Sequence, residues 1–208
     1  RHVNRRAAFH SEDEYRLAER RPLARAGDWT SHPEVRDVQS AIQSTERLVR
    51  IARGLGKQIH VLHVTTAWEM EFLGRHKDVA SVECTPQHLT LVGPEDYERL
   101  KGFAQMNPPI RDAKERAGVW WGLDQGVVDV LGSDHAPHTR EEKDRPYPAS
   151  PSGMPGVQTL LPIMLTHVAD GKLSLDRLVD LTSHGANRLF GLADRKSTRL
   201  NSSHTSVS

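Results

Sequence analysis

Residues 59–84 read IHVLHVTTAWEMEFLGRHKDVASVEC, and this stretch decides the predicted fold. It opens with an apolar run at 59–64 that is rich in β-branched residues, which is typical of a buried strand. Residues 67–76 have helical character, and 79–84 form the next apolar run. Two such strands joined by one helix predict a parallel sheet with helices packed on its faces.

The same alternation extends in both directions from this unit. A short segment ending at Phe9-His10 could close an earlier strand, and 127–131 predicts a later one. Helices are expected at 12–25, 35–53, 94–100, 111–125, 156–169 and 175–190, with Gly54 ending the second of them. The proline-rich, charged stretch 133–155 predicts a long loop of the functional kind. Four strand–helix units fit half of an eight-fold barrel or one doubly wound domain, and the pattern alone leaves both open.

Composition narrows the functional classes. The chain has 28 Lys and Arg against 27 Asp and Glu, so it offers no electrostatic reason to expect nucleic acid or membrane as a partner. No run approaches the roughly 18 apolar residues of a membrane span. The single cysteine, Cys84, excludes an internal disulfide and favours a cytoplasmic location. The absence of an initiator Met suggests a chain that begins inside a longer gene product. The Ser/Thr/Asn-rich stretch 194–208 is expected to be disordered or foreign to the fold.

Polar side chains of interest follow the predicted strands. His10, His63, Glu83 and Asp134 each lie at or just after a strand end. The carboxyl ends of parallel strands carry the active sites of α/β folds. Two histidines and an aspartate gathered there suit a zinc ion. A lone histidine beside a strand is more often a core or capping residue, so the prediction depends on the set.

The segment GSDHAPHTREEK, residues 132–143, is the strongest single signal. An aspartate beside a metal can serve as both ligand and proton carrier, which fits Asp134. His138 follows the rigid Pro137 and could reach an anionic substrate from the loop. The alternative is a polar loop that Asp134 merely caps.

Six motifs in order resemble the dihydroorotase family. They are HSEDE (10–14), HVLHVTT (60–66), VECTPQHL (82–89), QMNPPIR (105–111), SDHAPH (133–138) and SGMPGVQTLLP (152–162). Each motif is weak alone, but their combination is specific and covers about 190 of the 208 residues. The resemblance implies a metal-dependent (β/α)₈ barrel, to which residues 1–193 would contribute the fifth strand onward.

The resemblance also implies roles for individual residues. His10 and His63 match two zinc-binding histidines, and Asp134 matches an aspartate that binds metal and moves the proton. His138 matches a histidine that contacts the substrate carboxylate. Asn107 matches a residue that lines the pyrimidine pocket, and Pro155-Gly156 matches a backbone contact beside that pocket. His60 is expected to be structural, and a capping role is favoured for His88.

The resemblance is incomplete in one respect. The family's His-x-His pair, its nearby substrate-binding arginine and its metal-bridging lysine or aspartate are absent from these 208 residues. We therefore expect half a metal site, and a chain that is inactive by itself. The parent protein is expected to be a homo-oligomer that interconverts dihydroorotate and N-carbamoyl-aspartate, a small-molecule substrate pair.

Two alternatives remain open. One is a non-catalytic dihydroorotase-like subunit that scaffolds aspartate transcarbamoylase, against which the retained His10, His63, Asp134 and His138 argue. The other is a hydantoinase or allantoinase. Those families usually carry Cys-Pro-x-Tyr where this chain has the tetrapeptide 85–88, TPQH.

Overall fold

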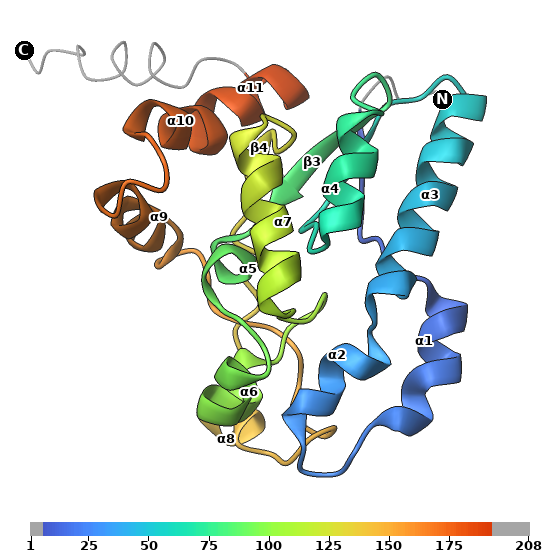
Figure 1. Cartoon of the computed structure of the whole chain (residues 1–208), viewed down its shortest axis with the longest axis vertical. Coiled ribbons are helices and arrows are strands. Elements are labelled where there is room, and N and C mark those ends of the chain that lie inside the picture. The colour runs from blue at the N-terminus through green and yellow to red at the C-terminus, as the bar shows by residue number, and fades with distance from the viewer. Residues whose placement is uncertain (1–5, 193–208) are drawn as a thin grey trace, which may run out of the picture.

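A computed structural model describes residues 6–192, and its centre is a sheet of four parallel strands (Figure 1). The strands are β1 (Ala7–Phe9), β2 (Ile59–Val61), β3 (Ala80–Cys84) and β4 (Val130–Leu131), and they lie side by side in sequence order. Phe9 is paired with Val61 and Val61 with Val82, so the strands end at nearly the same level. The prediction of a parallel α/β fold is therefore confirmed.

Helices connect the strands and pack against the sheet (Figure 1). The longer ones are α1 (Glu14–Arg20), α3 (Val38–Gly54), α4 (Ala67–Gly74), α7 (Ala113–Asp124) and α9 (Leu160–Ala169). The shorter ones are α2 (His32–Val35), α5 (Pro86–Thr90), α6 (Glu95–Leu100), α8 (Arg140–Lys143), α10 (Leu175–Val179) and α11 (Gly185–Phe190). Short 3-10 turns occupy Arg21–Leu23, Trp29–Ser31 and Lys101–Ala104. None of the described helices is long and apolar enough to cross a membrane.

Side-chain caps set where several helices begin. The carboxylate of Asp37 accepts a hydrogen bond from the backbone N–H of Ser40 at the start of α3. Thr66 and Asp112 cap α4 and α7 in the same way. Each cap satisfies a backbone N–H that the first helical turn leaves without a partner.

The main core lies between the sheet and the helices α3, α4, α7, α9 and α10. Val61, Val82 and Leu73 are among its fully buried side chains. Helices α4 and α7 pack closely because glycine replaces a side chain at their contact. A Cβ on Gly122 would lie 2.5 Å from the sulfur of Met70.

Several predicted boundaries were wrong. Strand 59–64 ends at Val61, because His63 adopts a left-handed backbone with φ of 36° and leaves the ladder. Strand 127–131 is reduced to Val130–Leu131. The helix predicted for 156–169 begins only at Leu160, and the helix predicted for 12–25 ends in a 3-10 turn. Residues 175–190 contain a π-helical turn at Asp180–His184 between α10 and α11.

Loop 133–155 holds more structure than was predicted. It contains α8, whose capping box joins Thr139 and Glu142, and a parallel bridge between His135 and Met154. The stretch 194–208 lies outside the described residues.

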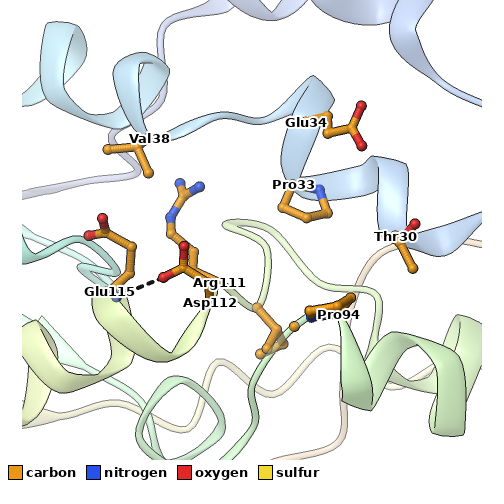
Figure 2. A pocket seen from close by; sticks show the side chains of 10 residues that line it. Thr30, Pro33, Glu34, Val38, Pro94, Arg111, Asp112 and Glu115 are labelled. Carbon is orange, nitrogen blue, oxygen red and sulfur yellow. Dashed lines mark hydrogen bonds between the residues drawn. The ribbon is translucent and has the colours of Figure 1, made fainter.

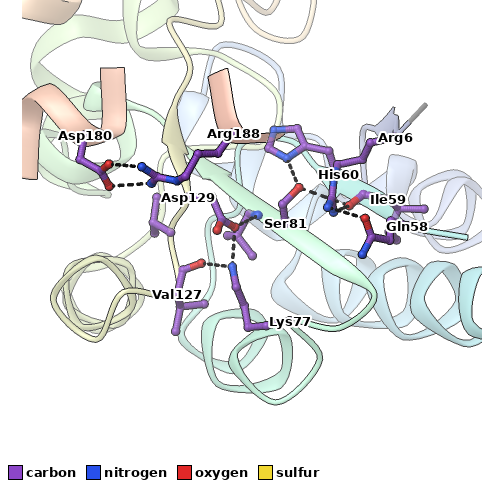
Figure 3. A network of polar contacts seen from close by, with 12 residues as sticks. Arg6, Gln58, Ile59, His60, Lys77, Ser81, Val127, Asp129, Asp180 and Arg188 are labelled. Carbon is purple, nitrogen blue, oxygen red and sulfur yellow. Dashed lines mark hydrogen bonds and ion pairs between the residues drawn. The ribbon is translucent and has the colours of Figure 1, made fainter. Parts of the chain in front are cut away.

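The amino ends of the strands are joined by structural polar contacts (Figure 3). Arg6 donates to the carbonyl of Ile59 at 2.9 Å, and Lys77 donates to the carbonyl of Val127 at 2.7 Å. The Asp129 carboxylate accepts from the backbone N–H of Val82 at 2.7 Å. These contacts tie successive strands together at the edge of the sheet that faces away from the candidate site.

Candidate functional site

His10 and His63 meet at the carboxyl edge of the sheet. His10 directly follows β1, and His63 follows the neighbouring strand β2. Nδ1 of His10 lies 2.6 Å from Nε2 of His63, and the ring centroids are 4.8 Å apart. The two ring nitrogens therefore face each other closely enough for one ring to donate a hydrogen bond to the other, which brings both imidazoles to one point at the strand ends.

Two of the predicted metal ligands have left-handed backbones. The φ angle is 36° at His63 and 43° at Asp134, and neither residue is glycine. Such a conformation costs about 1–3 kcal/mol for each residue and is found where the surroundings enforce it, often at functional sites. Glu83 is part of those surroundings, because its Oε1 accepts from the backbone N–H of His63 at 3.3 Å.

The electrostatics around His63 favour the neutral ring. Burial lowers the pKa of His63, while the nearby Asp134 carboxylate raises it, His10 lowers it and Glu83 raises it. A neutral imidazole is the form that binds a metal. The buried Nδ1 of His63 has no hydrogen-bond partner among residues 6–192.

The donor set suits zinc, but it is only part of a site. Two imidazoles and a carboxylate are ligands that zinc accepts, and the facing nitrogens of His10 and His63 fit that role. Asp134 is close enough to influence the pKa of His63. Within the described part of the chain, however, no group of three or more His, Cys, Asp and Glu is arranged to hold a metal ion. The roles of these three residues as ligands therefore remain predictions.

The loop that carries Asp134 runs beside the segment 152–156. The backbone N–H of Ala136 donates to the carbonyl of Met154 at 3.0 Å. Gly156 passes so close that a Cβ on it would lie 2.0 Å from the carbonyl oxygen of Ser133. The predicted backbone contact at Pro155-Gly156 is thus placed next to the predicted proton carrier.

His138 lies on the loop that carries Asp134 and faces the segment 152–156. Its Nε2 lies 3.3 Å from the carbonyl oxygen of Ser152, and its Nδ1 lies 3.6 Å from the carboxylate of Glu142. The residue is exposed, so its ring is available to a ligand. The structure therefore places His138 against Ser152 and Gly153, and a shared role of His138 and Gly156 in binding one substrate stays a prediction.

Asn107 lies on a third segment, 105–108, which contacts the segment 152–156. The backbone N–H of Gly153 donates to the carbonyl of Gln105 at 2.9 Å. Oδ1 of Asn107 is buried and lies near enough to the His32 ring to oppose the lowering of that ring's pKa by burial, but it forms no hydrogen bond of regular geometry with residues 6–192. An unpaired buried acceptor is costly, and a ligand that donates a hydrogen bond would relieve that cost.

Two histidines outside the predicted site have structural partners. Nδ1 of His60 lies 2.7 Å from Oγ of Ser81, and the ring is buried. Nε2 of His88 lies 3.0 Å from the carbonyl oxygen of Pro108, and its Nδ1 lies 2.8 Å from the hydroxyl of Thr85. Both ring nitrogens of His88 are occupied by the protein, which leaves none for a metal.

Sequence reasoning missed Lys143 and noticed Glu83 only as a strand end. Glu83 holds the backbone of His63, and its position at the end of an apolar strand was the available signal. Lys143 is the last residue of the segment 132–143, and its burial has no sequence signal, because lysine is ordinarily exposed.

A cavity of about 250 Å³ lies away from all these residues (Figure 2). Its lining comes from the segments around α2, α3, α6 and α7 and comprises Thr30, Pro33, Glu34, Val38, Gly93, Pro94, Ile110, Arg111, Asp112 and Glu115. None of the predicted site residues lines it, and its charged lining residues are Glu34, Arg111, Asp112 and Glu115. His10, His63 and Asp134 at the strand ends have side chains of the kind that bind a metal, so they form the better candidate site.

Curated relatives and solved structures agree on the class of protein. No protein-family model matches the chain. The dihydroorotases of Methanosarcina acetivorans and Methanosarcina mazei are 34% and 36% identical to it over 197 residues. Each alignment covers 89% of this chain and 42% or 43% of the relative. The L-hydantoinase (dihydropyrimidinase) of Arthrobacter aurescens superposes with a TM-score of 0.83 and 27% identity, over 90% of this chain and 44% of that one.

The parallel sheet and these likenesses place the chain among the cyclic amidohydrolases, whose fold is a (β/α)₈ barrel. Its sequence is similar to that of curated dihydroorotases, at 34% and 36% identity. The chain spans less than half the length of the curated relatives it matches.

Proposed function

We propose that this chain provides part of the active site of a dihydroorotase, which reversibly opens the ring of dihydroorotate to N-carbamoyl-aspartate. The observation that carries the proposal is the convergence of His10 and His63 at the carboxyl edge of the sheet. The homology to dihydroorotases supports the choice of substrate. The chemistry would belong to pyrimidine synthesis in the cytoplasm.

Each residue of the site has a defined task in this proposal. A zinc ion held by His10 and His63 would supply Lewis acidity and an activated water. Asp134 would accept a proton from the attacking water and return it to the ring nitrogen that leaves. A carboxylate with a neighbouring imidazole can carry out both transfers when it stays close to the reacting atoms.

The substrate is held by the adjoining loops. His138 faces the substrate carboxylate and, when protonated, forms a charge-assisted hydrogen bond with it. The unpaired Oδ1 of Asn107 accepts a hydrogen bond from a ring N–H. The backbone at Pro155-Gly156 completes the pocket, and Gly156 is required there because a Cβ would displace the loop of Asp134.

The other ligands are proposed to come from a further part of the barrel. Among residues 6–192, the structure offers two imidazoles and one nearby carboxylate, which is fewer than a closed zinc site needs. The matched relatives are more than twice as long as the alignment. We propose that residues 1–193 form one part of the barrel, that one or two zinc ions bind, and that the whole protein is a homo-oligomer.

The test compares the full-length protein with its Asp134→Asn variant. Both are assayed for ring opening of dihydroorotate, with hydantoin and allantoin as competing substrates, and their zinc content is measured by elemental analysis. The expected result is turnover of dihydroorotate alone, lost in the variant. Preferential turnover of hydantoin would support the second candidate, a hydantoinase, which the structural likeness to L-hydantoinase favours. No turnover with any substrate would favour a non-catalytic subunit that binds aspartate transcarbamoylase.

A further inference from the structure

Lys143 is a buried lysine without a carboxylate partner. It ends α8, only 4% of its surface is exposed, and it forms no ion pair with any of residues 6–192. Burial lowers its pKa to about 8. A charged group removed from water without a counter-ion is costly, so its neighbours must satisfy all of its donors.

Three backbone carbonyls meet that requirement. Nζ of Lys143 donates to the carbonyl oxygens of Gln105 at 3.0 Å, Pro151 at 2.8 Å and Gly153 at 2.8 Å. An ammonium group has three N–H donors, and this arrangement uses all of them. The backbone of Lys143 is also held, because Gly102 packs against it so closely that a Cβ there would lie 2.0 Å from its carbonyl oxygen.

The acceptors belong to two different segments. Gln105 begins the segment 105–108, which carries Asn107, whereas Pro151 and Gly153 precede the backbone of Gly156. The side chain of Gln105 reinforces the link, because its Nε2 donates to the carbonyl of Ser150 at 2.8 Å. The ammonium group of Lys143 therefore donates hydrogen bonds to both segments.

Two buried histidines hold the other carbonyls of the segment 105–108. Nε2 of His32 lies 2.9 Å from the carbonyl oxygen of Met106, and Nε2 of His88 lies 3.0 Å from that of Pro108. Asn107 is therefore flanked by carbonyls fixed from α2, α5 and α8. Lys143 therefore adds a charged donor to the contacts of Gln105 that connect this fixed segment to the opposite one.

We propose that Lys143 is a positioning residue, which fixes segment 105–108 against segment 151–156 so that Asn107, His138 and the backbone of Gly156 bind the same substrate. The identity of the substrate rests on the proposed function. The contacts by which Lys143 joins the two segments, which we call the clamp, do not depend on that function. Lys143 does not touch the reacting atoms. Its removal should therefore weaken substrate binding more than it slows the chemical step.

The experiment uses three variants of the full-length protein. Lys143→Met keeps the length of the side chain and removes every donor, and Lys143→Gln keeps two N–H donors without the charge. Lys172→Met is the matched control, because its ammonium is exposed and lies 3.9 Å from Asp170. The measurements are kcat and KM for dihydroorotate, zinc content, and hydrogen exchange of the backbone amides.

In Lys143→Met, kcat/KM should fall about 10- to 100-fold, mostly through a higher KM, while zinc content stays unchanged. The N–H of Gly153, which donates to Gln105, should exchange at least about 10-fold faster, whereas α3 and α7 keep their protection. Lys143→Gln should give an intermediate loss, and Lys172→Met should behave like the wild type.

Either of two hydrogen-exchange results in Lys143→Met would overturn the proposed role of Lys143: wild-type exchange at Gly153, or faster exchange spread evenly over α3 and α7. A loss confined to kcat would also overturn it. If Lys143→Met does not fold, Lys143→Gln carries the same comparison. A wild-type protein that does not open dihydroorotate would instead overturn the proposed function, and the exchange data would still decide on the clamp.

Discussion

Acid should destabilise this protein well above the pH at which its carboxylates titrate. His32 and His88 are buried, and burial lowers the pKa of His32 to about 4 and that of His88 to about 3. In the unfolded chain both are expected near the ordinary value of 6.5. Between these values the unfolded state binds more protons than the folded state, so stability is full above pH 6.5 and falls as the pH falls.

The magnitude follows from the two pKa values of each histidine. At pH 5 an unfolded histidine is almost fully protonated, whereas His32 and His88 in the fold are still mostly neutral. This difference removes about 2 kcal/mol for each side chain relative to pH 8, or about 4 kcal/mol in total. Both folded pKa values lie below 5, so the result at pH 5 depends little on their exact size. Domains are stable by about 5–15 kcal/mol, so the loss is large.

The assay is urea unfolding at pH 8, 7, 6 and 5, followed by tryptophan fluorescence. His32→Gln and His88→Gln keep an N–H donor for the carbonyls of Met106 and Pro108 but cannot titrate. Each should remove about half of the pH dependence, and the double variant should remove nearly all that the pair contributes. His184→Gln is the control, because His184 is exposed. A stability that is the same at pH 8 and pH 5, or a double variant with the wild-type slope, would refute the reasoning.

Three further predictions concern the site and the core. In the full-length protein, His138→Ala should leave zinc content unchanged and lower kcat/KM by an amount that corresponds to roughly 1.5–3 kcal/mol of transition-state stabilisation. Loss of zinc would show that His138 binds the metal. Gly122→Ala should destabilise the fold by about 1–3 kcal/mol in thermal unfolding, because its Cβ would meet Met70 at 2.5 Å, whereas Gly54→Ala, with nothing within 4 Å, should not destabilise it. Residues 1–208 alone should not hydrolyse dihydroorotate even with added zinc, and turnover comparable to that of the full-length protein would contradict the ligand count.

The alternation of strands and helices could be predicted because it depends on local patterns. Buried parallel strands are short apolar runs, and amphipathic helices repeat every 3.6 residues. The ends of these elements were less predictable. Strand β2 stops at Val61 because the chain turns into a left-handed conformation at His63, and that turn is held by Glu83 from the next strand. A contact across the sheet cannot be seen in the residues on either side of the turn.

The proximity of His10 and His63 could be inferred from the residues alone, because both follow strands of one parallel sheet, and such strands end at a common edge. The residues that support the substrate loops were decided only by the tertiary structure. Lys143, His32 and His88 come from three helices and meet the carbonyls of one segment, 105–108. Carbonyl acceptors exist at every residue, so their partners have no sequence signature. Long-range packing alone selects which of them a buried donor reaches.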